Sequence, residues 1–133
     1  MYIYYNTNPA NKIVGDCVIR GLSILLQKRW DEVYDDLMYL GKRMCDMPSS
    51  NAVWSEYLYQ HEYTRRIIPD TCHSCYTVRR FCDDHRNGAY LLATGSHVVA
   101  VIDGNYYDTW DSGDEIPVYY FKRRKYRKWS HQI

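Results

Sequence analysis

The chain has 133 residues, which suits one domain with a single core and is too short for two. Its hydrophobic fraction of 46% is typical of globular proteins and argues against a disordered chain. The net charge of +1 conceals an asymmetry, because residues 122–128 hold six of the 17 basic residues, leaving 11 basic against 16 acidic residues in 1–121.

Three stretches in the first half of the chain show the spacing of amphipathic helices, with apolar residues recurring three and four positions apart. The pattern predicts a helix that opens at Cys17, a second from Trp30 that ends near Gly41, and a third that is capped by Ser49 or Ser50 and reaches about His61. The stretch before the first of these helices, Asn6–Lys12, is predicted to be a loop.

The second half is rich in β-branched and aromatic residues, which favour strands. A short helix is expected over Thr77–His85, and strands are expected over Tyr63–Ile68, Ala89–Thr94, Val98–Ile102, Asn105–Thr109 and Val118–Phe121. The sequence therefore predicts an α+β fold in which N-terminal helices, the first carrying Cys17, pack on a C-terminal antiparallel sheet. We expect residues 1–121 to form the domain and residues 122–133 a basic tail.

Cys17 stands where a cysteine nucleophile would need to stand. A thiol reacts as its thiolate, and the unpaired N–H groups at a helix N-terminus favour an anion there. Cys17 follows Gly15 and Asp16 and opens the first apolar helical pattern. Such a nucleophile also needs an imidazole nearby, and a further group that holds the imidazole in the correct tautomer.

A predicted hairpin supplies those two groups. Asp103-Gly104 between two strand-like runs is a strong signal for a two-residue type I′ turn. The register that such a turn sets puts His97 on the same sheet face as Asp108 and Trp110, with Asp108 as its diagonal neighbour. Asp111 points the other way in this register, so Asp108 is the better partner for His97.

A cysteine at the start of a buried helix, then a histidine before a strand, then an acid or amide on the next strand is the chain order of papain-like cysteine peptidases. The segment Asp108-Thr109-Trp110-Asp111-Ser112-Gly113 resembles the papain-type stretch in which a Trp after the orienting residue shields its bond to the His. The Asp16-Cys17 pair and the small size resemble the peptidases that trim leader peptides (the C39 group), and the chain also resembles small papain-like proteins encoded by phages.

This resemblance implies a papain-like fold and cleavage of a peptide or isopeptide bond in a peptide or protein substrate, without a cofactor. Cys17 would be the nucleophile, His97 the base and Asp108 its orienting group. The family places an oxyanion-hole Gln six residues before the Cys, where this chain has Asn11, and Asn8 is a second candidate. The same three residues would equally serve an acyltransferase, a transglutaminase or an amidase.

A second group of residues has the spacing C-x2-C-x6-C-x2-H. A short helix would place two of its members on one face, and three thiolates with one imidazole suit tetrahedral Zn²⁺. A structural zinc site is therefore one interpretation, and a reduced CxxC pair without metal is the other. The four residues are Cys72, Cys75, Cys82 and His85.

The remaining features bear on partners and compartment. The basic tail is interpreted as a solvated segment whose charge balances the net acidic residues 1–121, rather than as a nucleic-acid-binding segment. Met1–Asn6 lacks the pattern of a secretory signal, no apolar run is long enough to span a membrane, and five cysteines do not read as a disulfide framework. A cytoplasmic setting is expected. The main alternative to an enzyme is a papain-like binding module, for example a phage inhibitor of a host protein.

Overall fold

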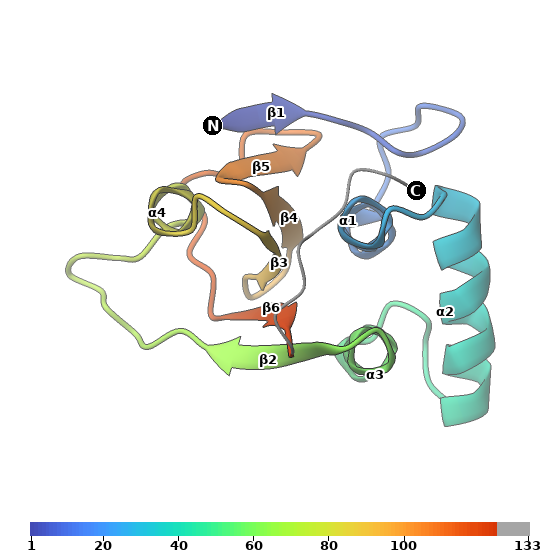
Figure 1. The fold of residues 1–133 in the computed structure, drawn as a ribbon. Coiled ribbons are helices and arrows are strands. Elements are labelled where there is room, and N and C mark those ends of the chain that lie inside the picture. Colours follow the sequence, from blue (N-terminus) through green and yellow to red (C-terminus); the bar gives the residue numbers. More distant parts are fainter. Residues whose placement is uncertain (125–133) are drawn as a thin grey trace.

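The computed structural model describes residues 1–124. Within them the chain forms an α+β fold with four helices and one mixed sheet of six strands in the order β1-β5-β4-β3-β6-β2 (Figure 1). The helices are α1 (Cys17–Leu26), α2 (Trp30–Met44), α3 (Asn51–Gln60) and α4 (Val78–Asp84), and the strands are β1 (Tyr2–Tyr4), β2 (Tyr63–Ile67), β3 (Ala89–Ala93), β4 (Val98–Ile102), β5 (Asn105–Asp108) and β6 (Tyr119–Arg123).

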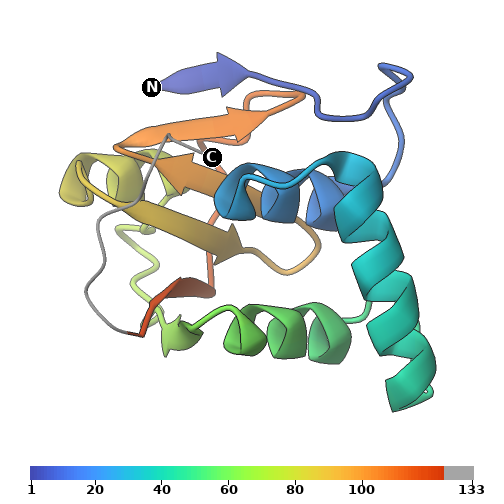
Figure 2. The same cartoon turned by 45° about the vertical axis from the view of Figure 1, so that its right-hand side comes forward.

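The sheet has a hydrophobic core on each face, because neighbouring residues of a strand point to opposite sides. On β3, Leu91 packs in the cluster formed with α1, α2 and α3, while Leu92 packs in the cluster formed with α4. Figure 2 shows α2 running outside the sheet from the end of α1 to the start of α3. None of the helices in residues 1–124 is both long and apolar enough to cross a membrane.

Local signals set several boundaries. The Ser50 side chain accepts a hydrogen bond from the N–H of Val53 at the start of α3, and the Thr77 side chain accepts one from Arg80 at the start of α4. The predicted hairpin register is confirmed where β4 and β5 pair. Ile102 pairs with Asn105, Val101 with Tyr106 and Ala100 with Tyr107. Asp103 and Gly104 have φ angles of 50° and 80°, as a type I′ turn requires.

The structure corrects the sequence prediction at three points. The sheet is mixed rather than antiparallel, because Tyr2–Tyr4 forms a strand parallel to β5. The second helix continues past Gly41 to Met44. The boundary expected at residue 121 falls inside β6, which is paired with β2 as far as Arg123. The rest of the predicted tail, residues 125–133, lies outside the described residues.

Candidate active site

The start of α1 lies against the start of β4, and this contact positions Cys17. Gly21 allows the helix to approach the sheet, because a Cβ at this position would come 2.8 Å from Cδ1 of Leu91. Cys17 is the first residue of α1 and is partly buried. Its sulfur accepts a hydrogen bond from the backbone N–H of Val98, the first residue of β4.

His97 stands immediately before β4 and connects Cys17 to Asp108. Its Nε2 lies 2.6 Å from Oδ2 of Asp108, and its side chain is also hydrogen-bonded to Cys17. Because Nε2 is directed at Asp108, the ring nitrogen left to face the thiol is Nδ1. Only 10% of the His97 side chain is exposed, so water competes little for either bond.

Asp108, at the end of β5, is the most fully satisfied carboxylate of the site and is 1% exposed. Besides His97, it accepts hydrogen bonds from Nη1 of Arg20 at 2.9 Å, from Oγ of Ser112 at 2.7 Å and from the N–H of Thr109 at 2.8 Å. Four donors on one carboxylate stabilise its ionised form and fix its orientation. The imidazole is therefore held by a rigid, charged partner.

The pKa values of the three groups are shifted in a way that favours an ion pair. Burial opposes the charged form of each group, yet in each case the hydrogen bonds and opposite charges outweigh burial. They raise the pKa of His97 to about 9, mainly through its bond to Asp108, and lower the pKa of Cys17, mainly through its bond to His97. The pKa of Asp108 is lowered by His97 and Ser112. Both shifts therefore favour the thiolate–imidazolium form of the Cys17–His97 pair.

Arg20 is a residue of the site that the sequence analysis missed. It is 6% exposed, and its guanidinium joins two buried carboxylates, with Nε 2.8 Å from Oδ1 of Asp16 and Nη1 2.9 Å from Asp108. Asp16 also accepts a hydrogen bond from the indole N–H of Trp30 at 2.9 Å. A signal was present in the sequence, because Arg20 lies three positions after Cys17 and so shares its helix face.

The structure brings Trp110 to His97, as the predicted hairpin face implied. The two rings have centroids 4.9 Å apart, and 45% of Trp110 remains exposed. Its indole therefore covers one side of the imidazole while presenting an aromatic surface to solvent. Asp111 contacts Tyr106 and Arg79 instead of His97, in agreement with the preference for Asp108.

The two asparagines suggested as oxyanion donors lie in the loop before α1. Asn8 already uses its amide, which donates to Oδ2 of Asp16 at 3.4 Å, while its Oδ1 accepts bonds from loop N–H groups. Asn11 is exposed, has a φ of 55° and accepts a long hydrogen bond from Asn6. Its Nδ2 makes no hydrogen bond within residues 1–124, so Asn11 is the one whose amide is available to a ligand.

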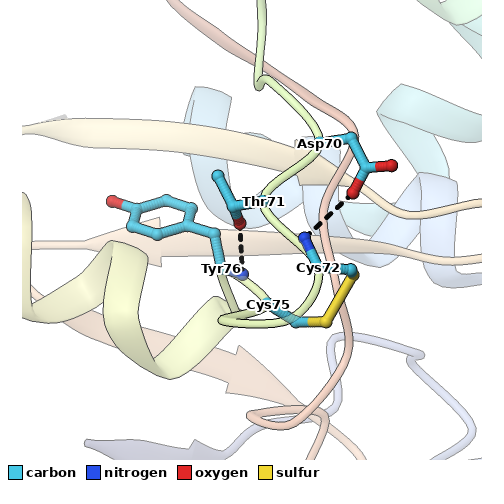
Figure 3. The surroundings of a disulfide bond; sticks show 5 residues. All are labelled: Asp70, Thr71, Cys72, Cys75 and Tyr76. Carbon is cyan, nitrogen blue, oxygen red and sulfur yellow. Dashed lines mark hydrogen bonds between the residues drawn. A yellow bond between two sulfur atoms is a disulfide. The ribbon is translucent and has the colours of Figure 1, made fainter.

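The four suggested zinc ligands are not arranged as a metal site. Cys72 and Cys75 are joined by a disulfide in the exposed loop after β2 (Figure 3), a pairing that the sequence analysis did not expect. Cys82 is buried in the core on the α4 face, and His85 stacks on Phe81 at 3.7 Å. Across residues 1–124, no three His, Cys, Asp or Glu side chains are grouped to hold a metal ion.

Comparisons of the chain with protein-family models, with curated proteins and with solved structures give no match. The interpretation of the site therefore rests on its own geometry and chemistry.

The raised pKa of His97 predicts a specific pH dependence of stability. Since the folded state favours the imidazolium, its contribution to the free energy of unfolding is complete below the ordinary pKa of 6.5 and is lost as pH rises through the raised value. Chemical denaturation of Cys17→Ser and of Cys17→Ser with His97→Gln checks this, because the serine removes the titrating thiol. The stability difference between the two proteins should be larger at pH 6 than at pH 10, and a constant difference would contradict the shift.

Proposed function

We propose that this chain is a papain-like cysteine hydrolase that cleaves a peptide or isopeptide bond, with Cys17 as nucleophile, His97 as base and Asp108 as the group that orients His97. The observation that carries the proposal is the continuous hydrogen-bonded series from Cys17 through His97 to Asp108, with the pKa of the thiol lowered and that of the imidazole raised. A cysteine with only a structural role does not need a thiol with a lowered pKa, whereas a nucleophile does.

The first half of the reaction is acylation. The Cys17 thiolate attacks the carbonyl carbon of the scissile bond, forming a C–S bond and moving the carbonyl electrons to oxygen. His97, already an imidazolium, donates its proton to the amine nitrogen as the C–N bond breaks. The amine leaves, and the acyl group stays on the sulfur as a thioester.

The second half is deacylation. The now neutral His97 takes a proton from water as the water oxygen attacks the thioester carbonyl. The C–S bond breaks, the carboxylic acid product leaves and the thiolate–imidazolium pair is restored. If an amine or alcohol replaces water in this step, the same residues perform acyl transfer. The three residues therefore specify chemistry through a thioester, but not which molecule accepts the acyl group.

Two features of the site would stabilise the charged groups of this reaction, the oxyanion and the ionised side chains. The backbone N–H of Cys17 is among the unpaired donors at the start of α1, and with the Asn11 amide it is the candidate to stabilise the oxyanion. Arg20 keeps Asp108 ionised and aligned, and its charge also lowers the pKa of Cys17. The buried arginine thus acts through Asp108 as a positioning residue.

The proposal is tested by measuring the alkylation rate of each cysteine with iodoacetamide between pH 5 and 9, located by mass spectrometry. Cys17 should react fast below pH 7 in the wild type and lose this reactivity in His97→Ala. Cys45, which is exposed, is the internal reference, and buried Cys82, whose pKa burial raises to about 11, should stay slow. Thermal melts of both proteins verify that the variant is folded.

The alternative is a non-catalytic binding module with the same fold, which has no use for a depressed thiol pKa. If Cys17 in the folded wild type reacts no faster than Cys45 at pH 6, the hydrolase proposal is wrong and the binding module is favoured. A fast Cys17 that is unaffected by His97→Ala would also contradict the proposal, because the ion pair would then not be the cause.

A further inference from the structure

One end of the sheet is strongly basic. There β6 pairs with β2, the last strand of the sheet, and β3 separates both strands from β4 and the candidate active site (Figure 1). Neither strand contains an acidic residue. The pairing places the start of the basic run of the C-terminus beside two arginines of β2. We call the basic residues of these two strands, with the residue that follows β6, the basic edge: Arg65, Arg66, Lys122, Arg123 and Arg124.

The register of the two strands brings these side chains around one edge of the sheet. Arg66 pairs with Tyr120, which packs against the α4-side core, so Arg66 and Lys122 point to the face on which α4 lies. Arg65 and Arg123 point to the other face. Each of these two guanidinium groups lies over a tyrosine ring, 5.3 Å and 5.2 Å from the ring centroid. Cationic groups therefore extend from both faces at the same end of the sheet.

The charges of the basic edge are left unpaired by the part of the chain that the structure describes. Within residues 1–124 none of its five side chains forms a salt bridge, whereas Arg20, Lys28 and Arg79 on other elements do. The Nε of Arg123 is buried and has no hydrogen-bond partner there. Acidic residues are not scarce, since residues 1–121 hold 16 of them against 11 basic residues. Like charges on adjacent strands repel each other, so a bound polyanion would relieve a strain that the fold itself leaves in place.

Partly exposed aromatic rings adjoin these charges. Tyr120 lies on the same face as Arg66 and Lys122, and its ring centroid is 6.1 Å from that of Tyr90 on β3. Both tyrosines are partly buried and partly open to solvent. Cationic side chains beside aromatic rings are the combination with which proteins hold single-stranded nucleic acid, because the cations contact phosphates and the rings stack on bases. An acidic protein would need the charges but not the rings.

We infer that the basic edge binds a single-stranded nucleic acid, with its cationic side chains on the phosphates and with Tyr90 and Tyr120 against the bases. Four of its five residues are arginines, whose planar guanidinium donates two hydrogen bonds to one phosphate in the usual geometry. This activity is independent of the proposed hydrolase, since the basic edge shares no residue with the Cys17–His97–Asp108 site.

Fluorescence anisotropy of a fluorescein-labelled oligo(dT) strand of about 20 nucleotides, titrated with the full chain between about 50 and 200 mM KCl, tests the inference. The wild type should bind, and its affinity should fall as salt rises, because each phosphate contact adds about 0.7 to the slope of log K against log salt. Arg65→Gln combined with Arg66→Gln should weaken binding and flatten that slope by about 1.4. Both arginines are exposed, and thermal melting verifies that the variant is folded.

Lys12→Gln combined with Lys42→Gln is the matched control. It removes the same charge from two exposed side chains that lie outside the basic edge and form no salt bridge within residues 1–124. It should bind oligo(dT) as the wild type does. Equal weakening in the two double variants, or no binding by the folded wild type at the lowest salt, overturns the inference. Poly-glutamate that displaces the labelled strand as effectively as unlabelled oligo(dT) also overturns it, because the surface would then suit an acidic protein. Each of these outcomes leaves the alkylation test of Cys17 unaffected.

Discussion

Replacing Arg20 by methionine should destabilise the protein by about 3–5 kcal/mol, the usual cost of removing one partner from a buried ion pair. The methionine fills much of the same volume but leaves the carboxylates of Asp16 and Asp108 without their shared cation. Asp108 retains His97, and Asp16 retains only neutral donors, such as the Trp30 indole, among the described residues. Urea denaturation at pH 7 measures the loss directly.

The pH dependence of this loss distinguishes charge from packing. Without Arg20, Asp108 loses one of the partners that lower its pKa, so the folded variant takes up a proton at higher pH than the folded wild type does. The stability deficit relative to the wild type should therefore shrink between pH 7 and pH 4. A deficit that does not change with pH would assign the effect to packing. Arg20→Lys is the matched control, because a lysine keeps the charge but lacks the planar fork of donors with which Arg20 contacts both carboxylates.

Replacing Asp108 by asparagine should strongly lower the reactivity of Cys17. The amide keeps the shape of the carboxylate but removes the charge that raises the pKa of His97 to about 9. The imidazole pKa then falls, the ion pair weakens and the thiol pKa rises. Each unit of that rise lowers the thiolate fraction about tenfold below the pKa. Iodoacetamide alkylation of Cys17 at pH 5.5 measures the change, and NMR titration of the His97 ring gives the cause.

Ser112→Ala is the control for the Asp108 variant. It removes a single hydrogen bond of 2.7 Å from the same carboxylate while leaving the charge in place. It should lower the Cys17 rate far less than Asp108→Asn does. Equal losses in the two variants would mean that orientation of the carboxylate matters and its charge does not, which would contradict the electrostatic account of the site.

Much of the candidate site could be predicted because it depends on local rules. The turn residues Asp103 and Gly104 require a two-residue turn, and the two-residue period of a strand then determines which side chains share a face. These local rules alone place His97 next to Asp108 and Trp110. Apolar spacing likewise placed Cys17 at the start of a helix.

Other parts of the site could not be predicted in this way because they depend on long-range packing. The bond between Arg20 and Asp108 joins residues 88 positions apart and exists because α1 crosses the sheet at Gly21. The disulfide between Cys72 and Cys75 was not expected, because a CxxC spacing is equally compatible with reduced thiols or a metal. The parallel pairing of β1 with β5 has no local signal in a three-residue strand.

The sequence by itself determined the order of the elements from α1 to β6, a serine cap for α3 at Ser49 or Ser50, and the hairpin that brings His97 to Asp108, since each follows from interactions within a few residues. The tertiary structure decided that the start of α1 meets the start of β4, so that Cys17 reaches His97. It also decided that Arg20 is buried between Asp16 and Asp108. The physical reason is that burial and charge pairing across the sheet depend on how distant elements pack, and no short-range pattern specifies that packing.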